Sequence, residues 1–108
     1  QHQDIPAQSK KARVDIANKQ KRILVEFDGP LHFKPFLGEE SLANRKARDA
    51  AVEKYAIENS YLLIRVSYDM YDGKKINELA IQRIREEVEN ESRSRVVRIG
   101  KFYESGSS

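Results

Sequence analysis

The sequence predicts an α/β fold in which a mixed central β-sheet is flanked by helices. Two apolar, strand-like segments lie near the N-terminus, a helical pattern covers 39–59, and an almost continuous apolar run covers 61–67. A strand, a long helix and a second strand in this order favour parallel pairing of the two strands through a right-handed crossover. With 108 residues, of which 39% are hydrophobic and 34% charged, the chain suffices for one core but not for two.

The first two strands are expected to form a hairpin. Alternating apolar residues predict a strand over 12–17, a polar turn follows, and the run ILVEF predicts a second strand over 22–28. A four-residue turn over 18–21 would place Asp15 opposite Leu24. Since alternate residues of a strand share a face, we expect Asp15, Glu26 and Asp28 on one face. The apolar side chains expected on the other face are Val14, Ile16, Ile23, Val25 and Phe27.

A loop and a long helix are expected after the second strand. Gly29–Pro30 ends that strand, and the loop extends to Gly38. From 39 to 59, apolar residues recur at three- and four-residue steps, which predicts an amphipathic helix. The run YLLIRVS over 61–67 then predicts a buried strand.

The last third of the chain is expected to contain one helix and a short segment after it. Asp72 is predicted to cap a helix over 74–91, and either a short strand or a strap follows over 96–99. The chain is thus divided into three segments: a loose leader over 1–11, one domain over 12–102 and a flexible tail over 103–108.

Composition excludes several classes of protein. The chain has no Cys, which rules out disulfides and thiolate metal sites. No apolar run approaches the about 18 residues of a membrane span, and no secretory signal opens the chain. We therefore expect an intracellular protein, in the cytoplasm or the nucleoid. The formal net charge of +3 hints at an acidic partner, although an ordinary mixed-charge surface is the alternative.

Four residues near the hairpin carry the strongest chemical signal: Asp15, Glu26, Asp28 and His32. Hydrolysis of a phosphodiester is helped by a cation that neutralises developing charge and acidifies a water. Mg²⁺ prefers carboxylate oxygens, which Asp15, Glu26 and Asp28 offer. An imidazole with a pKa near 6.5 suits general acid–base chemistry, which makes His32 a candidate. Solvated acids, an Arg13–Glu26 pair and a satisfied loop histidine are the alternatives.

The segments VEFDGPLHF, NRKARD and ENSYLLIRVSY together resemble the very-short-patch mismatch-repair endonucleases and the EDxHD homing endonucleases of the PD-(D/E)XK superfamily. The resemblance covers roughly 13–68, about half of the chain. It implies a restriction-endonuclease-like core and a divalent-metal-dependent endonuclease that hydrolyses phosphodiester bonds of double-stranded DNA. It also implies Mg²⁺ as the cofactor, with Mn²⁺ as a substitute, and a phage or another mobile element as a fitting source.

The resemblance implies roles for the same four side chains. Asp15 matches the metal-binding Asp of the first strand, and Glu26 matches the acid of the general pattern. Asp28 stands where the general pattern has its Lys. His32 matches the histidine that this branch uses near the scissile phosphate.

Asp49 matches the acid of the R-x-x-RD helix, where it either orients the site or is a structural partner of Arg45 or Arg65. The sequence departs from the family in one respect. The family's catalytic Glu on a helix before the first strand has no counterpart, because the segment 1–11 contains Asp4 but no Glu. The structural zinc of the repair enzymes needs Cys ligands, so no zinc is expected.

Basic residues around the proposed site are expected to hold the phosphate backbone of DNA: Lys34, Arg45, Lys46 and Arg48. A solvated helix face is the alternative for the last three. The sequence shows no zinc finger, helix-turn-helix or aromatic stacking platform. The oligomeric state is open, with a dimer among the options.

Two other functions compete with cleavage of DNA. RAP domains, which are RNA-associated modules, also contain a segment like VEFDGPLHF on a related fold. A nuclease-like fold that has lost catalysis would instead serve as a nucleic-acid-binding module. The R-x-x-RD helix favours the nuclease.

Overall fold

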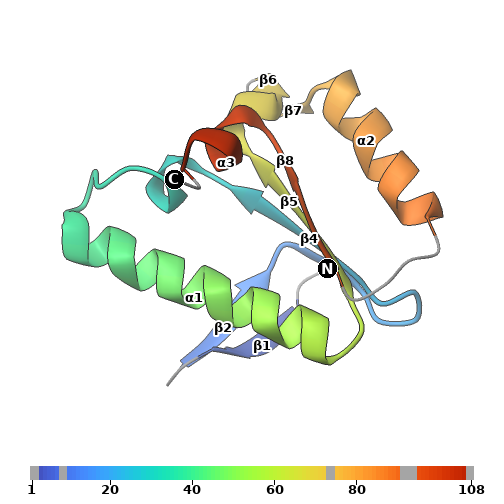
Figure 1. Cartoon of the computed structure of the whole chain (residues 1–108), viewed down its shortest axis with the longest axis horizontal. Helices are drawn as coiled ribbons and strands as arrows, with labels where there is room; N and C mark the ends of the chain where they lie inside the picture. The colour runs from blue at the N-terminus through green and yellow to red at the C-terminus, as the bar shows by residue number, and fades with distance from the viewer. Residues whose placement is uncertain (1–2, 8–9, 73–74, 91–94, 107–108) are drawn as a thin grey trace.

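The computed structural model describes the backbone of 3–7, 10–72, 75–90 and 95–106, and the side chains of 15–71, 75–90 and 95–103. Its centre is a four-stranded mixed sheet, which is antiparallel at its first pair and parallel elsewhere (Figure 1). The strands lie in the order β3 (Ile16–Asn18), β4 (Ile23–Asp28), β5 (Leu62–Ser67) and β8 (Arg95–Ile99).

Helices α1 (Glu39–Glu58) and α2 (Glu78–Glu89) cover opposite faces of this sheet (Figure 1). Under α1, Leu24 and Leu63 pack against Val52. The face under α2 carries a larger apolar cluster, whose buried members are Ile23, Val25, Leu62, Ile64, Val66, Ala80, Val97 and Ile99. The structure therefore confirms the predicted α/β class with a mixed sheet between helices, and the parallel pairing of β4 with β5.

The N-terminal part differs from the prediction. In place of a loose leader, β1 (Gln3–Ala7) and β2 (Lys10–Val14) form an antiparallel pair of their own beside α1 (Figure 1). The strand expected over 12–17 is interrupted at Asp15, whose Oδ2 accepts a hydrogen bond from the Phe27 backbone N–H at 2.7 Å. The Asp15 carboxylate thus accepts a hydrogen bond that a backbone carbonyl would accept in a continuous strand. The strand β3 starts one residue later, at Ile16.

The hairpin of β3 and β4 has the predicted faces but a different register. Ala17 lies opposite Leu24, where a turn over 18–21 predicted Asp15. The turn is 19–22 instead, and Arg22 adopts a left-handed backbone conformation with a φ of 56°. A shift of two residues preserves the alternation, so each side chain stays on its expected face.

The second helix starts later than predicted. Its N-cap is Asn77 and not Asp72, since the Asn77 side chain accepts a hydrogen bond from the Ala80 N–H at 2.9 Å. The segment ahead of this cap contains two short paired strands, β6 (Tyr71–Asp72) and β7 (Lys75–Ile76).

Three short helical segments meet at the carboxyl ends of the parallel strands (Figure 1). The 3-10 turn η1 (Pro30–His32) follows β4, and the 3-10 turn η2 (Tyr68–Met70) follows β5. The helix α3 (Lys101–Gly106) follows β8 and occupies much of the segment expected to be a flexible tail. Because parallel strands end at the same edge of a sheet, these segments build the surroundings of one site.

Gly100 joins β8 to α3 and supplies the first test of the fold. Its φ is 131°, which side chains rarely adopt, and an added Cβ would overlap the Ser67 hydroxyl. We expect Gly100→Ala to lower the free energy of unfolding by about 2 kcal/mol or more, and the melting temperature by roughly 10 °C. Gly29→Ala is the control, because its Cβ would meet nothing within 4 Å. Equal melting temperatures for the two variants would contradict the described junction.

Candidate active site

The sheet face under α1 changes from apolar to charged along the strands. The register of β4 and β5 places Leu24 beside Leu63, and then Glu26 beside Arg65. Because the two strands are parallel, the charged pair lies nearer their carboxyl ends. One step further along, Asp28 ends β4. Asp28 and Arg65 of this charged half line the candidate site, and Glu26 lies beside Arg65.

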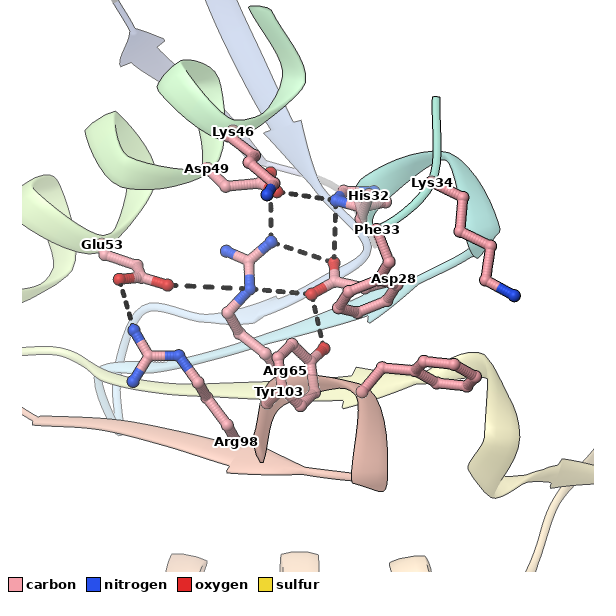
Figure 2. Close-up of a pocket in the computed structure, with 11 residues that line it drawn as sticks. Asp28, His32, Phe33, Lys34, Lys46, Asp49, Glu53, Arg65, Arg98 and Tyr103 are labelled. Atoms are coloured by element: carbon pink, nitrogen blue, oxygen red, sulfur yellow. Dashed lines mark hydrogen bonds and ion pairs between the residues drawn. The ribbon is translucent and has the colours of Figure 1, made fainter. Parts of the chain in front are cut away.

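Arg65 is the centre of the charged half and is only 2% exposed. Its Nε and Nη2 donate to the two oxygens of Asp28 at 2.8 and 3.0 Å (Figure 2). From α1, Asp49 lies 3.1 Å from Nη2 and Glu53 lies 3.8 Å from Nε. Burial alone would lower the pKa of Arg65, but Asp28 and Asp49 more than offset this and raise it. The guanidinium therefore stays charged.

Asp28 is 1% exposed, and both of its oxygens are engaged. Besides the bonds from Arg65, the Tyr103 hydroxyl donates to Oδ2 at 2.5 Å, and His32 Nδ1 lies 3.5 Å from Oδ1. Burial raises the pKa of Tyr103, and the neighbouring Asp28 raises it further, so the phenol keeps its proton. Asp28 thus ties α3, β5 and η1 to the end of β4.

His32 pairs with Asp49 across the space between η1 and α1. The distance from Nδ1 to Oδ2 of Asp49 is 2.7 Å (Figure 2). Because a carboxylate only accepts hydrogen bonds, Nδ1 is the nitrogen that donates to Asp49, and in the neutral form of the ring the lone pair is on Nε2. Within the described part of the chain, Nε2 has no hydrogen-bond partner. An imidazole held in this way can accept a proton from water or give one to a leaving group.

A pocket of about 630 Å³ opens over these groups (Figure 2). Its volume is within the range of small-ligand sites. Three basic side chains join its lining, namely Lys34 after η1, Lys46 from α1 and Arg98 from β8. Arg98 is paired with Glu53 at 2.7 Å. The pocket therefore combines an acid–base pair with positive charge, which suits an anionic ligand.

The structure brings together some of the predicted site residues and separates others. The predicted residues that line the pocket are Asp28, His32, Lys34, Lys46 and Asp49. The predicted residues that do not line it are Asp15, Glu26, Arg45 and Arg48. Of the three carboxylates expected to converge on a metal, only Asp28 reaches the pocket. Asp15 completes the hairpin through its bond to the Phe27 backbone.

The carboxylates of the pocket already have a cation of the protein as their partner. The described residues contain no group of three His, Asp or Glu side chains placed to hold an ion. Arg65 contacts both Asp28 and Asp49, so a cation already stands where the two carboxylates meet. An ion would have to compete with this guanidinium and with the Tyr103 hydroxyl for the same oxygens.

Sequence reasoning missed two residues that build the site. The sequence suggests Arg65 only as a structural partner of Asp49, and the structure shows this contact. The Asp49 carboxylate also contacts His32, so Arg65 helps to position the His32–Asp49 pair. The available signal was a single charge inside the apolar run YLLIRVS, since a buried charge requires partners. Tyr103 gave no signal, because it lies 75 positions from Asp28.

Glu26 has the most perturbed carboxyl group of the hairpin. Burial raises its pKa to about 8; Arg65 offsets part of this effect, and Asp15, Asp28 and Asp49 add to it. Glu26 is therefore largely protonated at neutral pH. The hairpin therefore does not present three full negative charges at neutral pH.

This raised pKa predicts that stability depends on pH. Glu26 has an ordinary pKa of 4.5 and a folded-state pKa of about 8, so the folded chain binds more protons between these values. Stability therefore falls as the pH rises through this window. Glu26→Gln cannot lose a proton, so its stability should lack this decrease. We expect the melting temperature of Glu26→Gln, relative to that of the parent, to rise between about pH 5 and about pH 9. Glu89→Gln, at an exposed position of α2, is the control. A pH-independent difference for Glu26→Gln would refute the assignment.

Within the described ranges, no helix is both long and apolar enough to cross a membrane. No protein-family model, curated protein or solved structure matches this chain. The resemblance carried by VEFDGPLHF and its companion segments stays a prediction. The structural features that bear on function are the pocket and the His32–Asp49 pair.

Proposed function

We propose that this chain is an intracellular nuclease-like domain, with a restriction-endonuclease-like core, that hydrolyses phosphodiester bonds of double-stranded DNA. The proposal is carried by the His32–Asp49 pair, whose Nδ1 and Oδ2 atoms are 2.7 Å apart in a pocket that Lys34 and Lys46 also line. Many hydrolases use an imidazole that a carboxylate holds in place. The basic side chains favour, among possible substrates, one with the anionic phosphate backbone of a nucleic acid. The sequence resemblance supports the same reaction.

In the proposed reaction, water attacks the phosphorus and one P–O bond of the backbone breaks. His32 Nε2 takes the proton of the attacking water or gives a proton to the leaving oxygen. Asp49 keeps the imidazole in the required tautomer and stabilises the imidazolium that forms. Lys34 and Lys46 neutralise charge that develops on the phosphate.

Mg²⁺, for which Mn²⁺ would substitute, belongs to this proposal on the strength of the sequence resemblance. The carboxylates give it no independent support, because Asp28 and Asp49 are both bonded to Arg65. Without a divalent ion, charge neutralisation would fall to Lys34 and Lys46. Cleavage in Mg²⁺, Mn²⁺ and EDTA therefore distinguishes a metal-dependent reaction from one that uses the two lysines alone.

A second candidate function is nucleic-acid binding without cleavage, either as an inactive nuclease-like fold or as a RAP-like RNA-binding module. The observation that favours it is the contact of Arg65 with Asp28 and Asp49, which neutralises the acidic side chains internally. In this case the His32–Asp49 pair would serve packing, and the basic pocket would bind a phosphate backbone.

The proposal predicts that His32 and Asp49 are needed for cleavage of plasmid DNA. We expect His32→Ala to slow cleavage by about 10²- to 10⁴-fold, the usual worth of a positioned acid–base group. Asp49→Asn preserves the size of the side chain but removes its charge, so it should slow the reaction and alter its pH–rate profile. Lys54→Ala, at an exposed position of α1, should cleave at the parent rate.

The same assay, run on plasmid, duplex oligonucleotide and RNA with Mg²⁺, Mn²⁺ or EDTA, separates the candidates. Cleavage at the parent rate by His32→Ala would refute the proposed role of His32. If the chain binds DNA but does not cleave it with either metal, the inactive nuclease-like binding module is the function that agrees with the result. Preferential binding of RNA, again without cleavage, would favour the RAP-like module.

A further prediction concerns the basic side chains. If Lys46 holds a phosphate, Lys46→Ala should weaken binding to unrelated duplexes by a similar factor and reduce the slope of log affinity against log salt by about 0.9. Arg45 and Arg48 lie on the same helix but outside the pocket lining, so their replacement by Ala shows how far the phosphate contacts extend. Lys54→Ala is again the control. If the slope of log affinity against log salt is unchanged in Lys46→Ala, Lys46 does not contact a phosphate and belongs to a solvated helix face.

A further inference from the structure

The imidazole of His32 lies between two carboxylates that belong to different elements. Its Nδ1 atom is 2.7 Å from Oδ2 of Asp49 on α1 and 3.5 Å from Oδ1 of Asp28 at the end of β4 (Figure 2). Because Nδ1 carries at most one proton, it donates a full hydrogen bond to only one of the two. The carboxylate that accepts this bond determines where the opposite nitrogen, Nε2, is placed in the pocket.

The two carboxylates differ in the other donors that they accept. Asp28 is 1% exposed and accepts from Nε and Nη2 of Arg65 at 2.8 and 3.0 Å, and from the Tyr103 hydroxyl at 2.5 Å. Asp49 has 22% of its side chain exposed and contacts Arg65 through Oδ1 at 3.1 Å, while its Oδ2 is directed at His32. Hydrogen bonds to a carboxylate stabilise its charge and weaken it as an acceptor for a further donor. Asp28 is therefore the weaker of the two acceptors for Nδ1.

Tyr103 is the donor that distinguishes the two acids. Arg65 restrains both of them, because its Nη2 lies 3.0 Å from Asp28 and 3.1 Å from Asp49. Of the two carboxylates, the Tyr103 hydroxyl bonds to Asp28. The Tyr103 ring packs edge-on against Phe33, with ring centroids 5.2 Å apart. Ring packing thus directs the hydroxyl at Asp28 independently of the hydrogen bond itself.

Loss of this hydroxyl would change the balance between the acids. Asp28 would keep its bonds from Arg65 but would have an unsatisfied lone pair in a buried position, which is costly. Its carboxylate would then compete more strongly for Nδ1 of His32 and for the shared Nη2 of Arg65. Both groups would be drawn away from Asp49, and the imidazole would turn toward the end of β4. Nε2 would leave the position in which Asp49 now holds it.

We propose that Tyr103 is a positioning residue of the candidate active site: by donating to Asp28, its hydroxyl leaves the Nδ1 proton of His32 to Asp49 and so fixes the direction of Nε2. The inference rests on the proposed function for the use that is made of Nε2, whereas the partner of Nδ1 can be measured in the free protein. It gives α3 a role at the site, although Tyr103 lies 75 positions from Asp28 along the chain.

The first test is the nuclear magnetic resonance signal of the His32 Nδ1 proton in the full chain without ligand. A short hydrogen bond to a carboxylate moves such a proton signal downfield. The chain has 2 histidines, so His2→Gln assigns the signal of His32. Tyr103→Phe removes the hydroxyl and keeps the ring, and we expect it to move the His32 signal upfield or to lose it through exchange with water. Asp49→Asn should change the signal in the same direction, because it removes the charge of the preferred acceptor.

Tyr68→Phe is the matched control for this signal. It undergoes the same chemical change as Tyr103→Phe, in a ring that also packs against Phe33. Tyr68 does not line the pocket, and among the described residues the donors bonded to Asp28 are Arg65 and Tyr103. Tyr68→Phe should therefore keep the His32 signal of the parent.

The second test is cleavage of plasmid DNA. We expect Tyr103→Phe to slow the reaction by about 10- to 100-fold, since a misplacement of about 1 Å can cost about 100-fold. The loss should fall on kcat and leave KM and DNA affinity unchanged, because the hydroxyl is bonded to Asp28. Tyr68→Phe should cleave at the parent rate.

An unchanged His32 signal in Tyr103→Phe would overturn the inference, as would equal changes in Tyr103→Phe and Tyr68→Phe. A loss of DNA affinity as large as the loss of cleavage would also overturn it, because Tyr103 would then act on the substrate directly. If Tyr103→Phe does not fold, 3-fluorotyrosine at position 103 decides. Its more acidic hydroxyl is a stronger donor, which should move the His32 signal further downfield, and a signal that stays in place would refute the role of Tyr103.

The two tests also separate this inference from the proposed function. If the His32 signal responds to Tyr103→Phe but the parent cleaves no nucleic acid, control of the imidazole by Tyr103 stands and the proposed nuclease does not. If the parent cleaves DNA through His32 and the signal is the same in Tyr103→Phe, the nuclease stands and the role of Tyr103 does not.

Discussion

The buried ion pair between Asp28 and Arg65 is the interaction on which the rest of the site depends. Both side chains are almost fully buried, and removing each charge from water costs several kcal/mol. Two parallel charge-assisted hydrogen bonds offset that cost, together with the bond from Tyr103 to Asp28 and the contact of Asp49 with Arg65. These four residues belong to β4, β5, α3 and α1, so the pair joins elements that are far apart in the sequence.

Orientation, more than stability, explains why a charged pair occupies this position. Replacing a buried ion pair by well-packed apolar residues is often neutral or stabilising by about 1–4 kcal/mol, whereas removing one partner costs about 3–5 kcal/mol. Apolar residues would fill the space but would not hold Asp49, which Arg65 contacts at 3.1 Å and which in turn holds His32 at 2.7 Å. The imidazole is therefore restrained before any ligand arrives, which lowers the entropy cost of using it.

The parts of the fold that could be predicted from the sequence are those with local signals. Helical periodicity located α1, and apolar runs located β4 and β5. Period-two alternation assigned the faces of the hairpin strands β3 and β4 correctly despite the shifted register. The bonds that build the site are not local, since Asp28 lies 37 positions from Arg65 and 75 from Tyr103. The role of Asp15 could not be predicted for the same reason. The register of the hairpin determines whether its carboxylate is free to bind a metal or accepts the Phe27 N–H, as it does in the structure.

The charge balance under α1 determines which ligands the pocket can receive. Two guanidinium groups meet three carboxylates there, namely Arg65 and Arg98 with Asp28, Asp49 and Glu53. Glu26 adds no full fourth negative charge at neutral pH, because burial raises its pKa to about 8. The buried guanidinium is thus occupied by the protein's own carboxylates and sets the geometry. Under the proposed function, Lys34 and Lys46 would attract the phosphate, and the phosphate would meet an imidazole that Asp49 already orients. Recognition and chemistry would then be assigned to different side chains of one pocket.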